Sequence, residues 1–269
     1  IAFKNTFQLD FEDFSEKWQR DLKKFYSPDL AKYENPKDYA TQITNYIKDR
    51  TYYNTSPAIS PDGTKMAYIS APGGVFGVFV KKIDEKGEGE QLLSSSRSLD
   101  FEDLNLLTPG ISWSNDASKL AISAKSGGED AIYIVNVKDG DYEKYKFGMK
   151  SITSVSWSPD GKQFAFIGTI IEKSDIFLYD IATKKLMNIT NDIFSEKHFT
   201  WSTDSKEIFF VSDRADYTNE KYSKDNFKMW TYNPYQSDIY KINIKDFVIT
   251  RLTFDPENEK TSLAISKNN

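Results

Sequence analysis

The chain has 269 residues, a formal net charge of −5 at pH 7 and an aromatic share of 15%. This mild acidity, without any basic block, excludes a nucleic-acid site of the usual electrostatic kind. No apolar run reaches the roughly 18 residues of a membrane-spanning helix, and a chain without cysteine has no disulfide framework and no thiol chemistry.

Residues 1–30 are predicted to contain one amphipathic helix. Its apolar stripe comprises Phe11, Phe14, Trp18, Leu22 and Phe25. These positions follow helical spacing, with Asp10 as the N-cap and Pro28 as the stop. One helix cannot bury such a stripe alone, so we expect it to dock on the side of the following fold or on a preceding domain. A membrane-surface helix is disfavoured because the polar face is not markedly basic.

Residues 31–55 are predicted to be a linker that contains one strand. Residues 42–45 read Gln-Ile-Thr-Asn, which resembles the Asn-Ile-Thr-Asn of residues 188–191 at the end of a later repeat. We therefore expect residues 41–45 to form an outer strand that closes a ring of sheets and hides a sheet edge. On this interpretation the chain is a fragment, with four repeats, the inner strand of a fifth at residues 262–266 and one closing strand.

A short turn motif then recurs through the rest of the chain. Ser-Pro-Asp-Gly occupies residues 60–63 and 158–161, and variants of it occupy residues 114–117 and 202–205, with Ser266 opening a fifth copy. The copies lie roughly 44 to 64 residues apart, and repeats of about 40–45 residues built from short strands are typical of propeller blades. Apolar runs flank each copy, as expected for a hairpin between two strands.

The residue types in this motif explain the turn. Proline pre-sets a negative φ, aspartate bonds to neighbouring backbone, and glycine adopts positive φ. The aspartates are Asp62, Asp116, Asp160 and Asp204. They resemble a set of catalytic carboxylates, but turn capping is the favoured interpretation.

Each repeat continues with two further predicted strands. Third strands are expected at residues 77–80, 131–134, 175–178 and 238–241, and fourth strands at 91–93, 142–147, 187–190 and 250–253. Four antiparallel strands per repeat predict an all-β fold, a β-propeller of four-stranded blades. About four blades and the start of a fifth are present, preceded by a short α-helical segment.

Two repeats carry insertions, at residues 94–109 and 213–237. In an up-and-down blade both would emerge on one face, opposite the Ser-Pro-Asp-Gly turns. Insertions gathered on one face often mark the working face of a repeat protein.

The second insertion supplies the candidate protein-binding residues. They are Tyr222, Phe227, Trp230, Tyr232 and Tyr235. Aromatic residues on a loop serve as interface anchors, or they form a small core for the loop itself. Both interpretations stay open at this point.

The sequence predicts no catalytic residue, no metal site and no cofactor. His198 is the single histidine, whereas zinc sites use several His or Cys ligands at set spacing. No Gly-x-Ser-x-Gly elbow is present for a serine nucleophile, and no glycine-rich loop opens a helix. We therefore expect a non-enzyme in which His198 is a loop or channel-mouth residue.

The repeats resemble those of TolB-like β-propellers. The resemblance lies in Ser-Pro-Ala-Ile-Ser-Pro-Asp-Gly at 56–63, Trp-Ser-Pro-Asp-Gly at 157–161 and the Asp-Ile-Phe and Asp-Ile-Tyr strands at 175–177 and 238–240. It covers about residues 40–269 and implies a ring of six blades. It also implies a protein-binding role in the bacterial periplasm.

A narrower resemblance concerns the helix and the first insertion. Residues 11–24 are similar to the last helix of a peptidase-MA-like domain, of the zinc metallopeptidase type, that precedes such a propeller in some bacterial proteins. Residues 101–110 also resemble that subgroup. The chain contains no His-Glu-x-x-His, so any zinc chemistry would lie outside it.

These observations lead to one functional hypothesis and one alternative. Residues 1–39 are interpreted as a helical segment that could end a preceding domain, and residues 40–269 as a partial TolB-like propeller. The resemblance implies a non-catalytic protein-binding module of a bacterial cell-envelope protein, with other envelope proteins as partners, no nucleic acid and no membrane span. The alternative is an accessory propeller domain of a larger zinc metallopeptidase.

Overall fold

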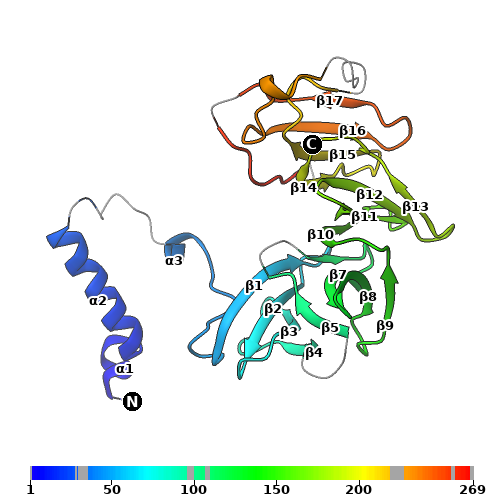
Figure 1. Cartoon of the computed structure of the whole chain (residues 1–269). Helices are drawn as coiled ribbons and strands as arrows, with labels where there is room; N and C mark the ends of the chain where they lie inside the picture. The colour runs from blue at the N-terminus through cyan, green and yellow to red at the C-terminus, as the bar shows by residue number, and fades with distance from the viewer. Residues whose placement is uncertain are drawn as a thin grey trace. The chain divides into compact units, whose positions relative to one another are not determined.

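The computed structural model describes residues 2–27, 29, 36–95, 100–106, 110–218, 227–255 and 258–266. The chain divides into two compact units, Ile1–Ile43 and Thr44–Asn269, and Figure 1 shows the elements of both. The interpretation of residues 1–39 as the end of another domain stays a prediction.

The first unit is helical. Its helices are α1 (Ala2–Phe7), α2 (Phe11–Tyr26) and α3 (Pro36–Tyr39). The predicted helix is confirmed and begins directly after Asp10, whose backbone is extended but whose side chain forms no cap. The Asp10 carboxylate accepts a hydrogen bond from Lys4 Nζ at 3.0 Å instead. Pro28, the predicted stop, lies outside the described residues.

The second unit consists of antiparallel sheets that follow one another in chain order. We call them blades 1 to 4. Blade 1 comprises β1 (Thr51–Ile59), β2 (Lys65–Pro72), β3 (Gly77–Lys82) and β4 (Glu90–Ser94). Blade 2 comprises β5 (Asp100–Leu104), β6 (Ile111–Trp113), β7 (Lys119–Ser126), β8 (Glu129–Asn136) and β9 (Tyr142–Lys146).

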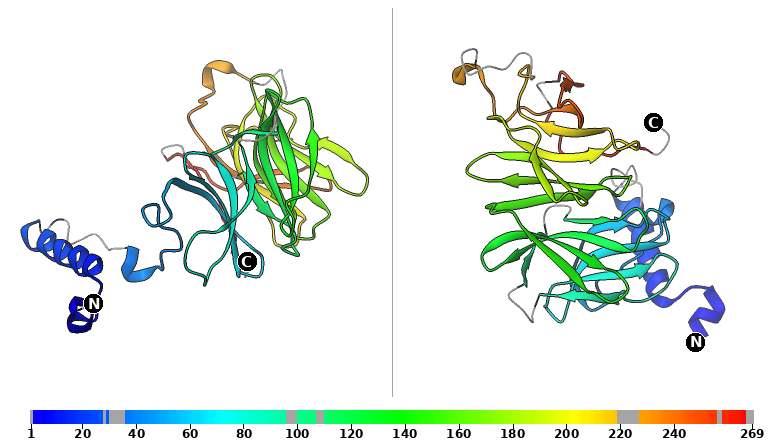
Figure 2. Two further views of the ribbon diagram at one scale, coloured as in Figure 1. Left: turned by 90° about the horizontal axis from the view of Figure 1, so that it is seen from below. Right: turned by 90° about the vertical axis from the view of Figure 1, so that its right-hand side faces the viewer.

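The remaining two blades are four-stranded. Blade 3 comprises β10 (Ser151–Trp157), β11 (Gln163–Thr169), β12 (Ser174–Asp180) and β13 (Lys185–Asn188). Blade 4 comprises β14 (Glu196–Trp201), β15 (Glu207–Ser212), β16 (Asp238–Asn243) and β17 (Ile249–Arg251). The predicted propeller architecture, with sheets stacked side by side, is confirmed (Figure 2).

The first insertion is not only a loop, which corrects the prediction. Within it, β5 pairs with β7 through Asp100↔Ser126 and Leu104↔Ala124, and β6 pairs with the rest of β7. The inner strand of blade 2 is therefore assembled from two pieces. The physical reason is burial, since Phe101 and Leu104 are each only 3% exposed.

Two further strand predictions were wrong. Residues 41–45 form no strand. The Asn45 carboxamide instead accepts a hydrogen bond from the Lys48 backbone N–H at 3.0 Å and closes a turn. Residues 262–266, the predicted inner strand of the fifth repeat, form none either. A strand needs a neighbour to pair its backbone groups, and among the described residues this segment belongs to no sheet.

The fourth strands of blades 3 and 4 end earlier than predicted, and threonines explain why. Thr190 Oγ1 accepts a hydrogen bond from the Ile176 backbone N–H at 3.0 Å. Thr253 Oγ1 accepts the equivalent bond from Ile239 at 2.9 Å. In both blades a threonine side chain thus replaces one of the two backbone hydrogen bonds of the next residue pair, while the other is still formed.

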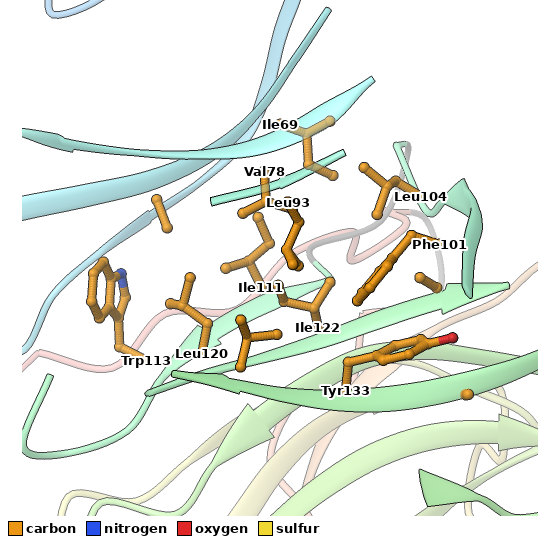
Figure 3. Packing of buried hydrophobic residues seen from close by; sticks show 14 residues of the cluster. Ile69, Val78, Leu93, Phe101, Leu104, Ile111, Trp113, Leu120, Ile122 and Tyr133 are labelled. Carbon is orange, nitrogen blue, oxygen red and sulfur yellow. The ribbon is translucent and has the colours of Figure 1, made fainter. Parts of the chain in front are cut away.

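Apolar clusters between neighbouring blades hold the stack together. In the cluster between blades 1 and 2, Ile69, Val78 and Leu93 of one sheet face Ile122 and Tyr133 of the next (Figure 3). Equivalent clusters join blade 2 to blade 3 and blade 3 to blade 4. Burial of apolar side chains on both sides of each interface is the main stabilising contribution.

The repeated tryptophans tie blades together with a hydrogen bond as well. Trp113 Nε1 donates to the Ala58 carbonyl of the preceding blade at 2.8 Å. Trp201 Nε1 donates to the Ser156 carbonyl at 3.3 Å. These bonds fix the inner strands, and with them the connections at the blade ends.

Candidate functional site

The four aspartates of the turn motif serve the turns. Ser60 Oγ donates to Asp62 Oδ1 at 2.5 Å, and the Thr64 backbone N–H donates to the same oxygen at 3.1 Å. The Ser60 hydroxyl and Thr64 lower the pKa of Asp62 to about 2. Gly63 follows with a φ of 73°, the positive value that the motif predicts.

The same geometry recurs in the other blades. Ser114 and Ser118 lower the pKa of Asp116 to about 2. Ser158 and Ser202 donate to Asp160 and Asp204, each at 2.7 Å. Because these carboxylates accept hydrogen bonds from their own turns, the turn-capping interpretation is confirmed.

The second insertion, described for residues 213–218 and 227–237, contains a small aromatic core. Its centre is Phe194, from the connection between β13 and β14. The rings of Tyr217, Phe227 and Tyr232 lie 5.5, 5.8 and 5.8 Å from the Phe194 ring. Two of the five candidate binding residues, Phe227 and Tyr232, therefore pack into the loop.

Other candidates point outward. Trp230 and Tyr235 are 83% and 85% exposed, and Met229 is 68% exposed. Met229 and Trp230 lie in a short 3-10 helix, η2 (Met229–Thr231). Tyr222 lies outside the described residues. The described part of the insertion thus has two kinds of aromatic residue: those that pack inside the loop and support it, and those that are exposed to solvent.

Arg214 anchors the insertion to blade 4. Its side chain is only 1% exposed, and its guanidinium lies 2.5 Å from Glu196 Oε1 and 2.9 Å from Asp192 Oδ2. The guanidinium carbon also lies 5.3 Å from the Phe210 ring centre and 5.7 Å from that of Tyr240. Arginine suits this position because its planar cation both pairs with carboxylates and stacks on rings.

The residues that flank Arg214 extend the anchor. Asp213 accepts hydrogen bonds from the Ser195 backbone N–H at 2.9 Å and from the Tyr232 hydroxyl. The Ala215 carbonyl accepts a bond from the Tyr240 hydroxyl at 2.6 Å. Three consecutive residues thus bind the start of the insertion to the blade.

Burial dominates the electrostatics of this cluster. Complete burial raises the pKa of Glu196 to about 8, against the opposing attraction of Arg214. Burial likewise raises the pKa of Asp192, although Arg214 and the Phe194 N–H act in the opposite direction. The buried cluster contains more carboxylates than cations, so it is sensitive to proton concentration.

Apolar side chains are also exposed on neighbouring connections at the same end of the blades. Ile170 and Ile171, between β11 and β12, are 52% and 71% exposed, and Ile193, between β13 and β14, is 43% exposed. Lys173 joins the two connections by donating to the Asp192 carbonyl. We call this surface, defined by Ile170, Ile171, Ile193, Met229, Trp230 and Tyr235, the insertion face.

His198 is not a loop residue, and the alternative expectation of a channel-mouth residue stays a prediction. It lies within β14 and pairs with Val211. Burial and the neighbouring Lys197 lower its pKa. Among the described residues, no group of three or more His, Cys, Asp and Glu is arranged to hold a metal ion, and no helix there is long and apolar enough to span a membrane.

Sequence reasoning found the insertion but missed its anchor. Arg214, Glu196 and Asp192 are ordinary surface residue types, and no short motif distinguishes them. The one available signal was the Asp-Arg pair at residues 213–214, directly after the apolar β15 sequence.

Comparison with known proteins gives relatives in both sequence and structure. No family model matches the chain. The Tol-Pal system protein TolB of Francisella tularensis is 28% identical over 155 residues, which cover 56% of this chain and 34% of that protein. The chain thus spans about a third of the length of the curated relatives it matches.

Solved structures share the fold. TolB from Acinetobacter baumannii superposes with a TM-score of 0.55 and 20% identity, covering 75% of this chain and 43% of that one. A puromycin hydrolase superposes with a TM-score of 0.56 and 11% identity, covering 80% and 30%. At these identities the likeness shows the fold alone, and the resemblance to the peptidase-MA subgroup stays a prediction.

Proposed function

Because this chain contains a TolB-like β-propeller, we propose that it is a non-catalytic protein-binding module of a bacterial cell-envelope protein. Its curated relatives are named Tol-Pal system proteins. By that relationship the module works in the periplasm or elsewhere in the envelope, where it recruits or scaffolds other envelope proteins through the insertion face.

One observation carries the proposal: the insertion holds exposed aromatic side chains on a fixed support. Trp230 and Tyr235 are more than four-fifths exposed, while Phe227 and Tyr232 of the same insertion pack on Phe194. Tryptophan and tyrosine dominate binding energy at protein interfaces. A fixed support reduces the conformational entropy lost on binding.

The buried anchor supports the same proposal. A loop whose only role is to connect β15 to β16 needs no completely buried Arg214–Glu196 pair, because burying charges costs more than leaving them in water. The pair instead orients the insertion. We infer that this orientation serves the presentation of Met229, Trp230 and Tyr235.

Recovery of partners from a bacterial envelope extract tests the proposal. Immobilised wild-type protein is compared with a Trp230→Ala/Tyr235→Ala variant and with a Tyr52→Ala control, which removes a 75% exposed ring from β1. We expect an envelope protein whose recovery falls at least about tenfold with the double variant, as for interface hot spots, and is unchanged with the control. Equal recovery by all three proteins would contradict the proposal.

A further inference from the structure

A threonine hydroxyl lies between two buried carboxylates where blade 3 meets blade 4. Thr190 Oγ1 lies 3.0 Å from Glu196 Oε2 and 3.3 Å from Asp175 Oδ1. The same oxygen accepts a hydrogen bond from the Ile176 backbone N–H at 3.0 Å. Glu196 and Asp175 are each only 2% exposed, so solvent does not screen these contacts.

One hydroxyl proton cannot satisfy both carboxylates. A threonine hydroxyl has a single proton to donate and two lone pairs that accept. If Glu196 and Asp175 were both ionised, one of the two contacts would join oxygen atoms with no proton between them. A protonated Glu196 removes this conflict, because its O–H donates to Thr190 while the Thr190 proton goes to Asp175. The Ile176 N–H and the Glu196 O–H then occupy both lone pairs of the threonine oxygen.

Blade 4 contains the equivalent threonine with a single carboxylate partner. Thr253 Oγ1 donates to Asp238 Oδ1 at 2.7 Å, a shorter distance than the 3.3 Å from Thr190 to its aspartate. Six residues after each threonine the chain has a glutamate. In blade 4 this residue, Glu259, is exposed and pairs with a lysine instead. Within the described residues, the single proton of Thr253 therefore satisfies its one carboxylate, and the conflict is specific to Glu196.

In the described part of the chain, carboxylates outnumber cations around Glu196. The carboxylates are those of Asp175, Asp192, Glu196 and Asp213, and the cations are Lys173 and Arg214. Arg214 is shared between Glu196 and Asp192, and Lys173 lies 3.7 Å from Asp175. Burial disfavours the charged form of a carboxyl group, which takes up a proton when its cation is insufficient. A proton on Glu196 brings the cluster closer to neutrality.

The other titratable groups described nearby do not supply the missing positive charge. Burial raises the pKa of both Tyr232 and Tyr240 above the ordinary tyrosine value, so their hydroxyls keep their protons and stay neutral. Burial lowers the pKa of His198 from its ordinary 6.5, so this imidazole is neutral near pH 7. Asp238 and Arg251, from β16 and β17, lie 2.5 Å apart and pair with each other.

We propose that Glu196 holds a proton on Oε2 and shares it with Asp175 through the Thr190 hydroxyl, and that this buried proton site controls how firmly the insertion is held. The link to the insertion is direct, because Glu196 Oε1 lies 2.5 Å from the Arg214 guanidinium. When the proton leaves, two carboxylates face one hydroxyl proton at the start of β14, and the Arg214 anchor is weakened.

The direction of the pH effect follows from the burial of Glu196. Burial raises the pKa of Glu196 from 4.5 to about 8, so the closed cluster binds the proton more tightly than an opened one. The stability that the proton contributes is fully present below pH 4.5 and is lost as the pH rises through about 8. The proton site does not depend on what the insertion face binds.

Carbon-13 NMR of protein labelled at the glutamate side-chain carboxyl carbon tests the proton site. Glu196→Gln identifies the resonance by its loss. We expect this resonance to titrate near pH 8, whereas exposed glutamates titrate close to their ordinary value. Titration of Glu196 in the ordinary glutamate range would overturn the proposal, because the side chain would then carry no proton at neutral pH.

Thr190→Val removes the hydroxyl with little change of shape and tests whether the proton is shared. We expect the Glu196 midpoint to fall by about one pH unit, because the protonated form loses two hydrogen bonds and the ionised form loses one. Thr190→Ser keeps a hydroxyl and should retain the wild-type midpoint. Thr253→Val removes the equivalent hydroxyl of blade 4 and should also leave the midpoint unchanged. An unchanged midpoint in Thr190→Val would overturn the sharing.

Hydrogen exchange of residues 227–237 tests the link to the insertion. Glu196→Gln is the reference, because its amide can donate to Thr190 and accept from Arg214 at every pH, as the protonated acid does. Comparison of the two proteins at one pH cancels the intrinsic pH dependence of exchange. We expect the ratio of wild-type to variant exchange rates to rise by up to about tenfold per pH unit between pH 4.5 and about 8, and then to level off. A constant ratio would overturn the link between the proton and the insertion.

Discussion

The two insertions were predicted to emerge on the same face of the propeller, but they have different structures. The one before blade 2 carries Phe101 and Leu104 into the core and adds β5 to the sheet. The one in blade 4 keeps its described residues out of the ladder and builds its own core around Phe194 and Arg214. An inserted segment can therefore add a strand to a blade or expose side chains to solvent. Which of the two occurs depends on whether its apolar residues reach the interface between blades.

Of the changes that test this difference between the insertions, removal of the Arg214 charge should lower the stability of the protein most. Arg214→Met leaves Glu196 and Asp192 buried without their cation, so we expect the free energy of unfolding to fall by about 3–5 kcal/mol. Denaturant unfolding measures the loss, and hydrogen exchange of residues 227–237 reports the release of the insertion. Lys245→Met, at an exposed position in the turn between β16 and β17 of the same blade, should change stability by less than about 0.5 kcal/mol.

Truncation of Phe101 tests the other insertion. Its ring lies 4.1 Å from that of Tyr133, and Figure 3 shows it in the cluster between blades 1 and 2. Phe101→Ala should destabilise the protein by about 3 kcal/mol through lost burial and the cavity left behind. Asp103→Ala, an exposed change in the same strand, should be nearly neutral. Equal effects of the two changes would contradict the placement of β5.

The pH dependence of stability distinguishes the insertion in blade 4, which is anchored by Arg214 and Glu196, from the insertion before blade 2, which is anchored by apolar residues. Burial raises the pKa of Glu196 from 4.5 to about 8, so the folded state binds a proton more tightly than the unfolded state. The stability that this proton contributes is present below pH 4.5 and is lost as pH rises through about 8.

Glu196→Gln should remove this dependence, because the amide cannot ionise. The difference between wild type and variant across this pH range should be at least about 1.4 kcal/mol, the contribution of a single pKa unit. Thermal unfolding at a series of pH values measures it. Parallel profiles for the two proteins would show that Glu196 does not titrate in this range.

The smallest effect is expected at the presented side chains. Trp230→Ala removes a ring that is 83% exposed, so the free energy of unfolding should change by less than about 0.5 kcal/mol. Denaturant unfolding measures this change. Phe227→Ala, which removes a ring packed on Phe194, is the comparison and should lose more stability. A loss above about 1 kcal/mol for Trp230→Ala would mean that this ring supports the loop instead of facing a partner.

The sequence by itself determined the elements that depend on local chemistry. The Ser-Pro-Asp-Gly turns, their capping aspartates and the alternating strands around them predicted the blades, because turn residues and period-two apolar patterns act over a few residues. The start of α2 after Asp10 and the position of both insertions were predicted for the same reason. The strand predictions at residues 41–45 and 262–266 were wrong, because a strand also needs a neighbour to pair with.

Only the tertiary structure decided which side chains support the candidate site and which are presented. Phe227 and Trp230 lie three residues apart and have similar character, yet one packs on Phe194 and the other is exposed. Arg214 meets Glu196 and Asp192 because the antiparallel pairing of β14 with β15 brings the two ends of this hairpin together. Burial is a property of the assembled blades, so a one-dimensional pattern could locate the insertion but not its orientation.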